Sequence, residues 1–244
     1  LPVSHKKDVF IAALGEEGVL LLLADSTNAE REGYTASEKT VGDRFDTIFR
    51  NISGRIILTT FASNVHRIQQ AIWAAEQNNR KVAVLGRSME NVTSIAREMG
   101  YLQCKKNTMI DIDQVKDYPD KHVLIITTGS QGEPMAGLAR MAKGEHRQVQ
   151  IKEGDTIVIS ASPIPGNEKS ISRTIDNLYR LGANVMYERS LGIHVSGHAS
   201  QEELKVLLTM VKPTFFVPIH GEYRMLYKHK CLAESVGIPA NHIF

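Results

Sequence analysis

HVSGHASQEELKVLLTMVKPTFFVPIHGEY, residues 194–223, is the stretch around which the rest of the chain is organised. It predicts a loop, a helix over 201–211, a strand over 215–219 and a second loop. His194 and His198 lie in the first loop, and His220 follows the strand. A helix–strand unit with imidazoles in both loops can bring distant histidines to one edge of a sheet, so the stretch predicts a functional site.

Outward from this stretch, short uninterrupted apolar runs alternate with helical patterns, and polar loops separate them. This pattern is typical of an α/β domain with a largely parallel sheet flanked by helices. The run from Val19 to Ala24 is expected to be a strand that is buried on both faces, and residues 111–121 a polar surface excursion. The predicted strands cover 19–24, 55–60, 81–85, 122–128, 155–160, 184–187 and 215–219.

The bulk composition excludes few function classes. A hydrophobic fraction of 42%, a charged fraction of 23% and a net charge of +2 are ordinary for a soluble globular protein, without a global field for nucleic acid or membrane. No run is long enough to span a bilayer. Cys104 and Cys231 form no CxxC pair, which favours a reducing compartment without disulfides or thiolate metal sites. Because the chain begins at Leu1, we expect a fragment or a trimmed chain.

The loops after the predicted strands are rich in glycine, small hydroxyl side chains and cations, which suit phosphate oxygens at helix N-termini. His66, Arg67 and Ser130 are candidate phosphate contacts, although each could equally be structural or solvated. The Gly129–Pro134 loop lacks the Gly-Lys-Ser/Thr ending of a Walker A motif and is not GxGxxG. A dinucleotide-binding protein is therefore disfavoured.

The segment His194–His198 admits two interpretations. Two histidines four residues apart on a helix could bind one metal, but Ser196 and Gly197 make a helix there unfavourable. A loop with two imidazoles and a serine suits a phosphate pocket or acid–base chemistry, unless the side chains only satisfy loop hydrogen bonds. Ser200 and Glu203 fit a capping box for the helix that follows.

Asp25 and His220 each end a predicted strand. A carboxylate there can orient a histidine, or it can cap the amides of its own loop. A lone histidine at a strand end is more often structural, and a metal-ligand role for His220 needs partners. The chain contains no HxHxD, HExxH or CxxC motif.

Seven segments taken together resemble ribonuclease J, a metallo-β-lactamase-fold ribonuclease of the β-CASP group. The resemblance runs through nearly the whole chain, and it implies a partial metallo-β-lactamase segment over 1–36, a β-CASP domain over 37–190 and the C-terminal part of the metallo-β-lactamase domain over 191–244. The segments are LLLADSTNAE, TTFASNVHRIQQ, VLGRSMENV, TTGSQGEPMAGLARMA, SASPIPGNE, HVSGHASQEE and PIHGEYRM.

The resemblance implies metal-dependent hydrolysis of RNA in the cytoplasm, in rRNA processing and mRNA decay. It implies a 5′-to-3′ exonuclease that prefers single-stranded RNA with a 5′-monophosphate, and an endonuclease as well. Two zinc ions per active site are implied, with manganese or magnesium as alternatives. The implied protein partner is a second copy or a ribonuclease J paralogue, and no membrane is involved.

The resemblance also assigns roles to residues. His220 is a metal ligand, whereas His198, oriented by Asp25, contacts phosphate and can protonate the leaving oxygen. His194 and Ser196 fall in the phosphate pocket, with Gly197 beside them. His66, Arg67 and Ser130 remain candidate phosphate contacts on the residues alone.

The family's main metal motif, HxHxDH, would lie upstream of Leu1. A single imidazole cannot hold a catalytic zinc, which needs about three protein ligands. We therefore expect this chain alone to be inactive and not to bind zinc stably. The alternative is a non-catalytic RNA-binding or scaffold subunit of a ribonuclease J hetero-complex, although the presence of both His198 and His220 favours the active form.

Overall fold

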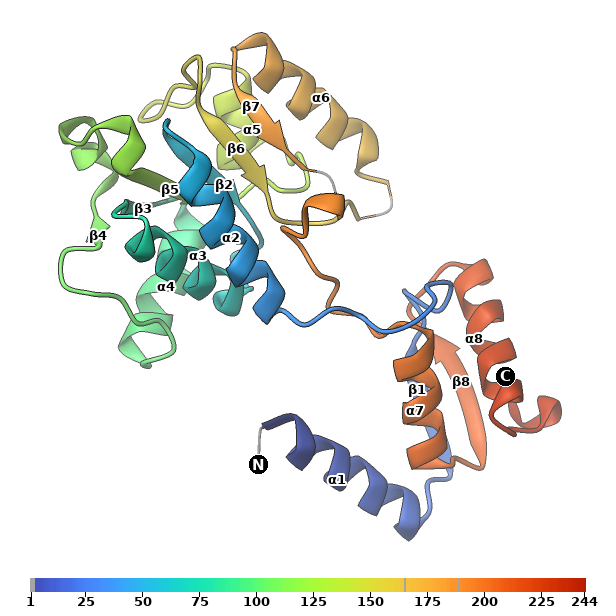
Figure 1. Cartoon of the computed structure of the whole chain (residues 1–244). Coiled ribbons are helices and arrows are strands. Elements are labelled where there is room, and N and C mark those ends of the chain that lie inside the picture. Colours follow the sequence, from blue (N-terminus) through green and yellow to red (C-terminus); the bar gives the residue numbers. More distant parts are fainter. Residues whose placement is uncertain (1–2, 165, 188) are drawn as a thin grey trace. The chain divides into compact units, whose positions relative to one another are not determined.

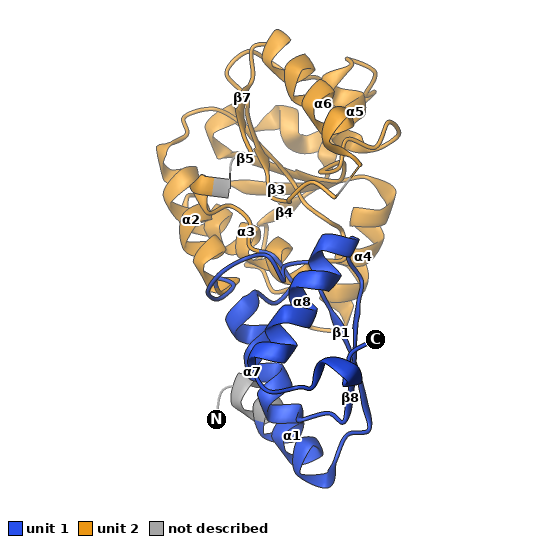
Figure 2. Cartoon of the chain, turned by 90° about the vertical axis from the view of Figure 1, so that its right-hand side faces the viewer, with its two compact units in different colours: residues 1–36, 196–244 blue, residues 37–195 orange. Residues whose placement is uncertain are grey.

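All paired strands of the described chain run parallel to their neighbours, in two separate sheets. The computed structural model describes residues 3–164, 166–187 and 189–244. The chain divides into unit 1, residues 1–36 and 196–244, and unit 2, residues 37–195 (Figure 2). The predicted α/β class with a largely parallel sheet is confirmed.

Unit 2 contains a six-stranded sheet with the order β4-β3-β5-β2-β6-β7 (Figure 1). Its central strands are buried along their whole length because helices cover both faces, which explains their uninterrupted apolar sequences. The strands are β2 (Ile56–Thr59), β3 (Lys81–Leu85), β4 (Met109–Ile110), β5 (Val123–Thr127), β6 (Thr156–Ile159) and β7 (Asn184–Met186).

Two sets of helices enclose this sheet. Residues of α2, α3 and α4 share a core with one face, and residues of α5 and α6 share a core with the other. β2 and β5 are neighbours, and the helices that follow them, α3 and α5, lie on opposite faces (Figure 1). The helices are α2 (Lys39–Asn51), α3 (Val65–Gln77), α4 (Arg87–Glu98), α5 (Gly137–Ala142) and α6 (Glu168–Arg180).

In unit 1, β1 (Leu21–Asp25) pairs with β8 (Phe215–Ile219), so that Asp25 lies opposite Ile219. Both strands therefore end at the same edge, and the Ser26 amide donates to the Ile219 carbonyl at 2.9 Å. The helices of this unit are α1 (Val3–Glu17), α7 (Gln201–Val211) and α8 (Tyr223–Ser235). Its core joins Ala24, Leu208, Phe216 and Ala233.

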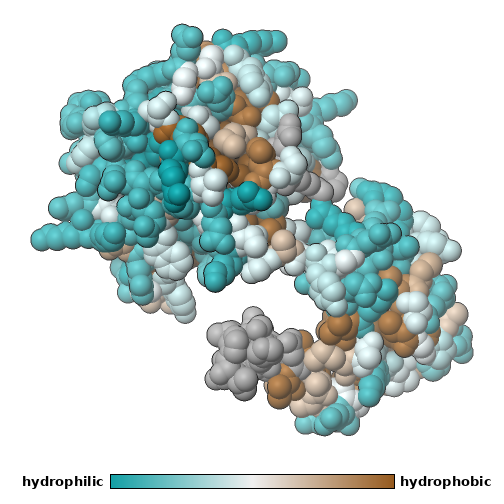
Figure 3. All heavy atoms as spheres, in the orientation of Figure 1, coloured by the Kyte–Doolittle hydropathy of each residue, from teal (hydrophilic) through white to brown (hydrophobic). Residues whose placement is uncertain are grey.

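The expectation that the first strand is buried on both faces was wrong. The side chains of Leu21 and Leu23 are 47% and 53% exposed, whereas Leu22 and Ala24 pack into the core. Side chains alternate along a strand, and in the described chain the side chains of one face of β1 pack into the core while those of the other face are exposed. Figure 3 shows the hydrophobic side chains that remain on the surface of this unit.

Local sequence signals are confirmed, and residues 111–121 form a surface segment as predicted. The predicted capping box of Ser200 and Glu203 is present. The polar segment is ordered: the edge strand β4 precedes it, and it contains the short helices η1 (Ile112–Asp117) and η2 (Asp120–His122). Two further short helices are η3 (Arg189–Leu191) and η4 (Ala240–His242).

Among the described helices, none has the length and hydropathy of a membrane span.

Candidate functional site

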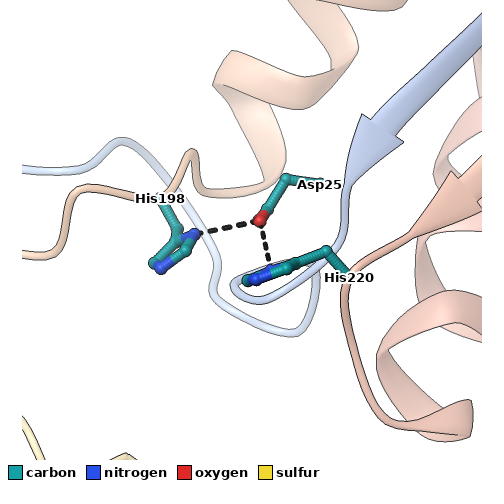
Figure 4. Close-up of side chains that lie close together, drawn as sticks. All are labelled: Asp25, His198 and His220. Carbon is teal, nitrogen blue, oxygen red and sulfur yellow. Dashed lines mark hydrogen bonds and ion pairs between the residues drawn. The ribbon is translucent and has the colours of Figure 1, made fainter.

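Asp25, His198 and His220 meet in unit 1, although Asp25 ends β1, His198 lies in the loop before α7 and His220 follows β8 (Figure 4). Both carboxylate oxygens of Asp25 lie 3.1 Å from Nδ1 of His198. Oδ2 of Asp25 also lies 2.6 Å from Nδ1 of His220. The two imidazole rings stack, with centroids 5.6 Å apart and planes inclined by 23°. One carboxylate thus orients two imidazoles.

The loop after β1 carries the side chains that hold His198 in place. Nδ2 of Asn28 donates to Oγ of Ser196 at 2.9 Å and to the His198 carbonyl at 2.8 Å. The hydroxyl of Thr35 donates to the same carbonyl at 2.9 Å. The His198 amide donates to Ser196 at 3.2 Å. This segment is a non-helical loop, as predicted from Ser196 and Gly197.

His220 adopts a left-handed backbone conformation, with φ +56°. This region is uncommon for a residue with a side chain, and it persists where surrounding contacts hold it. Here the hydroxyl of Thr27 donates to the His220 carbonyl at 3.1 Å and lies 3.0 Å from Nδ1 of the ring. The turn after β8 is thereby fixed to the loop after β1, and the imidazole faces Asp25.

The Asp25 carboxyl is held in its ionised form. Partial burial acts to raise its pKa, but the hydrogen bond from the Thr27 amide and the proximity of His198 and His220 outweigh burial and lower it below 3.8. A carboxylate accepts hydrogen bonds only, so the bonds to Asp25 assign a proton to Nδ1 of His198, and the 2.6 Å ion-pair contact favours the same tautomer for His220. The Nε2 atoms then carry the lone pairs.

This donor set fits a metal ion. One ligand atom from each of Asp25, His198 and His220 lies within 4.8 Å of the others, and carboxylate oxygen and imidazole nitrogen are preferred zinc ligands. A second arrangement follows the observed hydrogen bonds, in which Nε2 binds the cation while Nδ1–H donates to a carboxylate. In this second arrangement His198 and His220 present Nε2 to a cation or a phosphate.

The predicted phosphate contacts fall in different places. Ser196 and exposed Gly197 belong to unit 1 beside His198, whereas His194 belongs to unit 2. His66 is exposed on α3. Ser130 lines a cavity of about 800 Å³, together with loop residues that follow β2, β3 and β5. Ligands bind at the carboxyl ends of parallel strands in α/β sheets, so this position is compatible with the phosphate contact predicted for Ser130. That contact stays a prediction.

The side chain of Arg67 is almost completely buried, with 1% of its surface exposed. Its guanidinium donates to both carboxylate oxygens of Glu38, at 2.5 and 2.7 Å, and to Oγ of Ser160 at 2.8 Å. It also lies 3.0 Å from Nδ1 of His194. A guanidinium engaged in this way is a structural element of unit 2, which argues against the phosphate contact predicted for Arg67.

Sequence reasoning did not identify the supporting residues Thr27, Asn28 and His229. His229 is fully buried and its Nδ1 lies 3.0 Å from the hydroxyl of Ser26. The signal that could have identified it is the spacing on α8, where His229, Leu232 and Ala233 share one buried face.

Two family models match the chain. The model described as "Ribonuclease J, beta-CASP domain" matches residues 53–178, within unit 2. The model described as "Zn-dependent metallo-hydrolase RNA specificity domain" matches residues 184–243, which include His198 and His220. The matched ranges thus cover the six-stranded sheet and two of the three residues of the cluster.

Curated relatives are similar over nearly the whole chain. Ribonuclease J of Synechocystis sp. is 52% identical over 233 residues, which are 96% of this chain and 36% of the relative. Ribonuclease J of Thermus thermophilus is 52% identical over 237 residues, 97% of this chain and 41% of the relative. Ribonuclease J2 of Bacillus subtilis is 48% identical over 234 residues, 96% and 42% respectively. The chain thus spans well under half of each of these relatives.

Proposed function

The chain belongs to the ribonuclease J family, and we propose that it is the part of a metal-dependent ribonuclease that supplies one imidazole ligand and the phosphate-facing histidine. The observation that carries this proposal is the Asp25 carboxylate placed between His198 and His220, at 3.1 and 2.6 Å. Structural histidines do not require a shared carboxylate, whereas metal-ligating and acid–base histidines regularly have one.

The roles of the three residues follow from their geometry. His220 offers Nε2 as a metal ligand while its Nδ1 pairs with the Asp25 carboxylate. His198 faces the phosphate, and when both its nitrogens carry protons it can pass the Nε2 proton to the leaving oxygen. Asp25 stabilises that charged imidazole, as acids do beside catalytic histidines. A bound divalent cation supplies an activated water and neutralises phosphate charge.

The substrate in this proposal is single-stranded RNA with a 5′-monophosphate, cut from the 5′ end and also internally. Ser196 and Gly197 lie next to His198 in unit 1 and suit the terminal phosphate. Unit 2 corresponds to the inserted β-CASP domain, and unit 1 to two pieces of the metallo-β-lactamase domain. Cys104 and Cys231 are both free thiols, in keeping with a reducing, cytoplasmic location.

The proposed metal is zinc, two ions per site, with manganese or magnesium as alternatives. In the described residues one cluster offers three ligand groups, and its carboxylate is already bonded to both imidazoles. Two ions need more ligands than these. We therefore propose that the 244-residue chain alone neither binds zinc stably nor cleaves RNA.

The test compares this chain with the longer natural protein that contains it. Both are incubated with RNA carrying a 5′-monophosphate or a 5′-triphosphate, with EDTA and after readdition of zinc, manganese or magnesium. We expect metal-dependent cleavage by the longer protein alone, faster on the monophosphate. RNA binding without cleavage by the longer protein would instead support the non-catalytic subunit of a ribonuclease J complex.

A further inference from the structure

His229 is a buried imidazole that the proposed chemistry does not use. It projects from α8 and is fully buried, as is Ser26. Its Nδ1 lies 3.0 Å from the Ser26 hydroxyl, and its ring packs edge-on against Phe216 of β8, with centroids 4.8 Å apart. One side chain therefore links α8, β8 and the loop that follows β1.

Ser26 lies between two residues that shape the site. It follows Asp25 directly, and its own amide is bonded to the Ile219 carbonyl at 2.9 Å. The next residue, Thr27, donates its amide to Asp25 at 3.0 Å and its hydroxyl to the His220 carbonyl at 3.1 Å. A displacement of Ser26 would therefore move both the carboxylate and the threonine that fixes His220.

The imidazole of His229 is costly to bury. Its Nε2 has no hydrogen-bond partner among the described residues, and a buried unpaired polar atom destabilises a fold. Burial lowers the pKa of His229 to about 4, although the charge of Asp25 acts to raise it. A leucine would fill the space without these costs, so what the imidazole adds is its hydrogen bond to Ser26.

We propose that His229 is a positioning residue: through its hydrogen bond to Ser26 it fixes the Asp25–Thr27 turn, and thereby the orientation of His198 and His220 toward Asp25. The importance of the His229–Ser26 hydrogen bond for RNA cleavage rests on the proposed function. The geometric claim stands apart from it, because it concerns how three side chains of this chain face one another.

The experiment records histidine side-chain 1H–15N correlation spectra of the 244-residue chain at pH 8, without metal or RNA. The His198 and His220 signals are assigned by single substitutions to alanine. In the unaltered chain both rings should carry the proton on Nδ1. Ser26→Ala and His229→Leu should each move both sets of signals toward those of a free imidazole. His229→Asn, whose amide nitrogen can take the place of Nδ1, should leave them unchanged.

Leu232→Ala is the matched control, because Leu232 is buried on the same helix and its hydrocarbon side chain cannot form a hydrogen bond to Ser26. It should lower the melting temperature and leave the His198 and His220 signals in place. Unchanged signals in a folded Ser26→Ala chain would overturn the proposal, and so would the same signal shifts in Leu232→Ala. If His229→Leu does not fold, the spectra of Ser26→Ala and His229→Asn are sufficient to test the proposal. Failure here leaves cleavage by the longer protein as a separate question.

Discussion

The carboxylate of Asp25 lies 3.1 Å from Nδ1 of His198, although the two residues are 173 positions apart in the chain. Parallel pairing of β1 with β8 brings Asp25 to the sheet edge where His220 also emerges. Asn28 and Thr35 then bind the His198 carbonyl and draw that loop to the same edge. Strand pairing and hydrogen bonds within unit 1 therefore bring together two residues that are far apart in the chain.

Replacing Asp25 with asparagine should lower kcat/KM of the longer protein on 5′-monophosphorylated RNA by roughly 10–100-fold, the usual effect of removing a partner that orients metal-site histidines. The amide keeps the shape of the carboxylate but places an N–H opposite one of the two imidazole N–H groups. Asp43→Asn, at an exposed position on α2, is the control and should leave kcat/KM unchanged. Equal values for the two variants would contradict the orienting role.

Unit 1 should lose stability between pH 6.5 and pH 4. His229 has a folded-state pKa of about 4, mainly because of burial, against 6.5 in an unfolded chain. Between these values the unfolded state binds the proton and the folded state does not, so the free energy of unfolding falls as pH falls. The loss is on the order of 3 kcal/mol at most.

Urea titrations followed by the NMR amide signals of α8, at pH 7, 5.5 and 4.5, measure this dependence. In His229→Asn the loss should become much smaller. Asp25 cannot account for a loss in this range, because its pKa is lowered below 3.8 and its stabilising effect disappears only at more acidic pH. A pH dependence that persists unchanged in His229→Asn would show that another group is responsible.

Arg67→Lys should destabilise unit 2 by about 1–3 kcal/mol, because lysine cannot reproduce the paired hydrogen bonds to Glu38 or the bond to Ser160. Trp73 lies on the same helix, so its fluorescence reports the unfolding of this unit. Arg50→Lys, an exposed ion pair with Asp46, is the control and should change stability little. If Arg67→Lys lowered the affinity for RNA without changing the free energy of unfolding, the result would support the phosphate contact predicted for Arg67.

Much of the architecture could be predicted from sequence because it depends on local patterns. The buried strands of unit 2 are continuous apolar runs, and the capping box of Ser200 and Glu203 is readable from two residues. The pairing of Asp25 with His198 was expected from the family resemblance, since no local pattern connects loops so far apart.

Other features depend on tertiary context. The run of leucines in β1 looks the same whether one or two faces are covered, so the exposure of Leu21 and Leu23 had no sequence signal. The sequence placed Arg67 in the polar loop after a strand, where phosphate-binding arginines occur. The structure places it in the first turn of α3, buried in an ion pair with Glu38. The shared role of Asp25 in orienting His220 also required the register of β1 and β8.

The most direct test of the central claim is the cleavage rate of 5′-monophosphorylated RNA by the longer protein carrying His220→Ala, at saturating metal. His122→Ala serves as the control, because His122 lies in unit 2, where its Nδ1 bonds to the Asn79 carbonyl. We predict that cleavage is abolished in His220→Ala and retained in His122→Ala. Undiminished cleavage in His220→Ala would contradict the assignment of His220 as a metal ligand, and with it the proposed site.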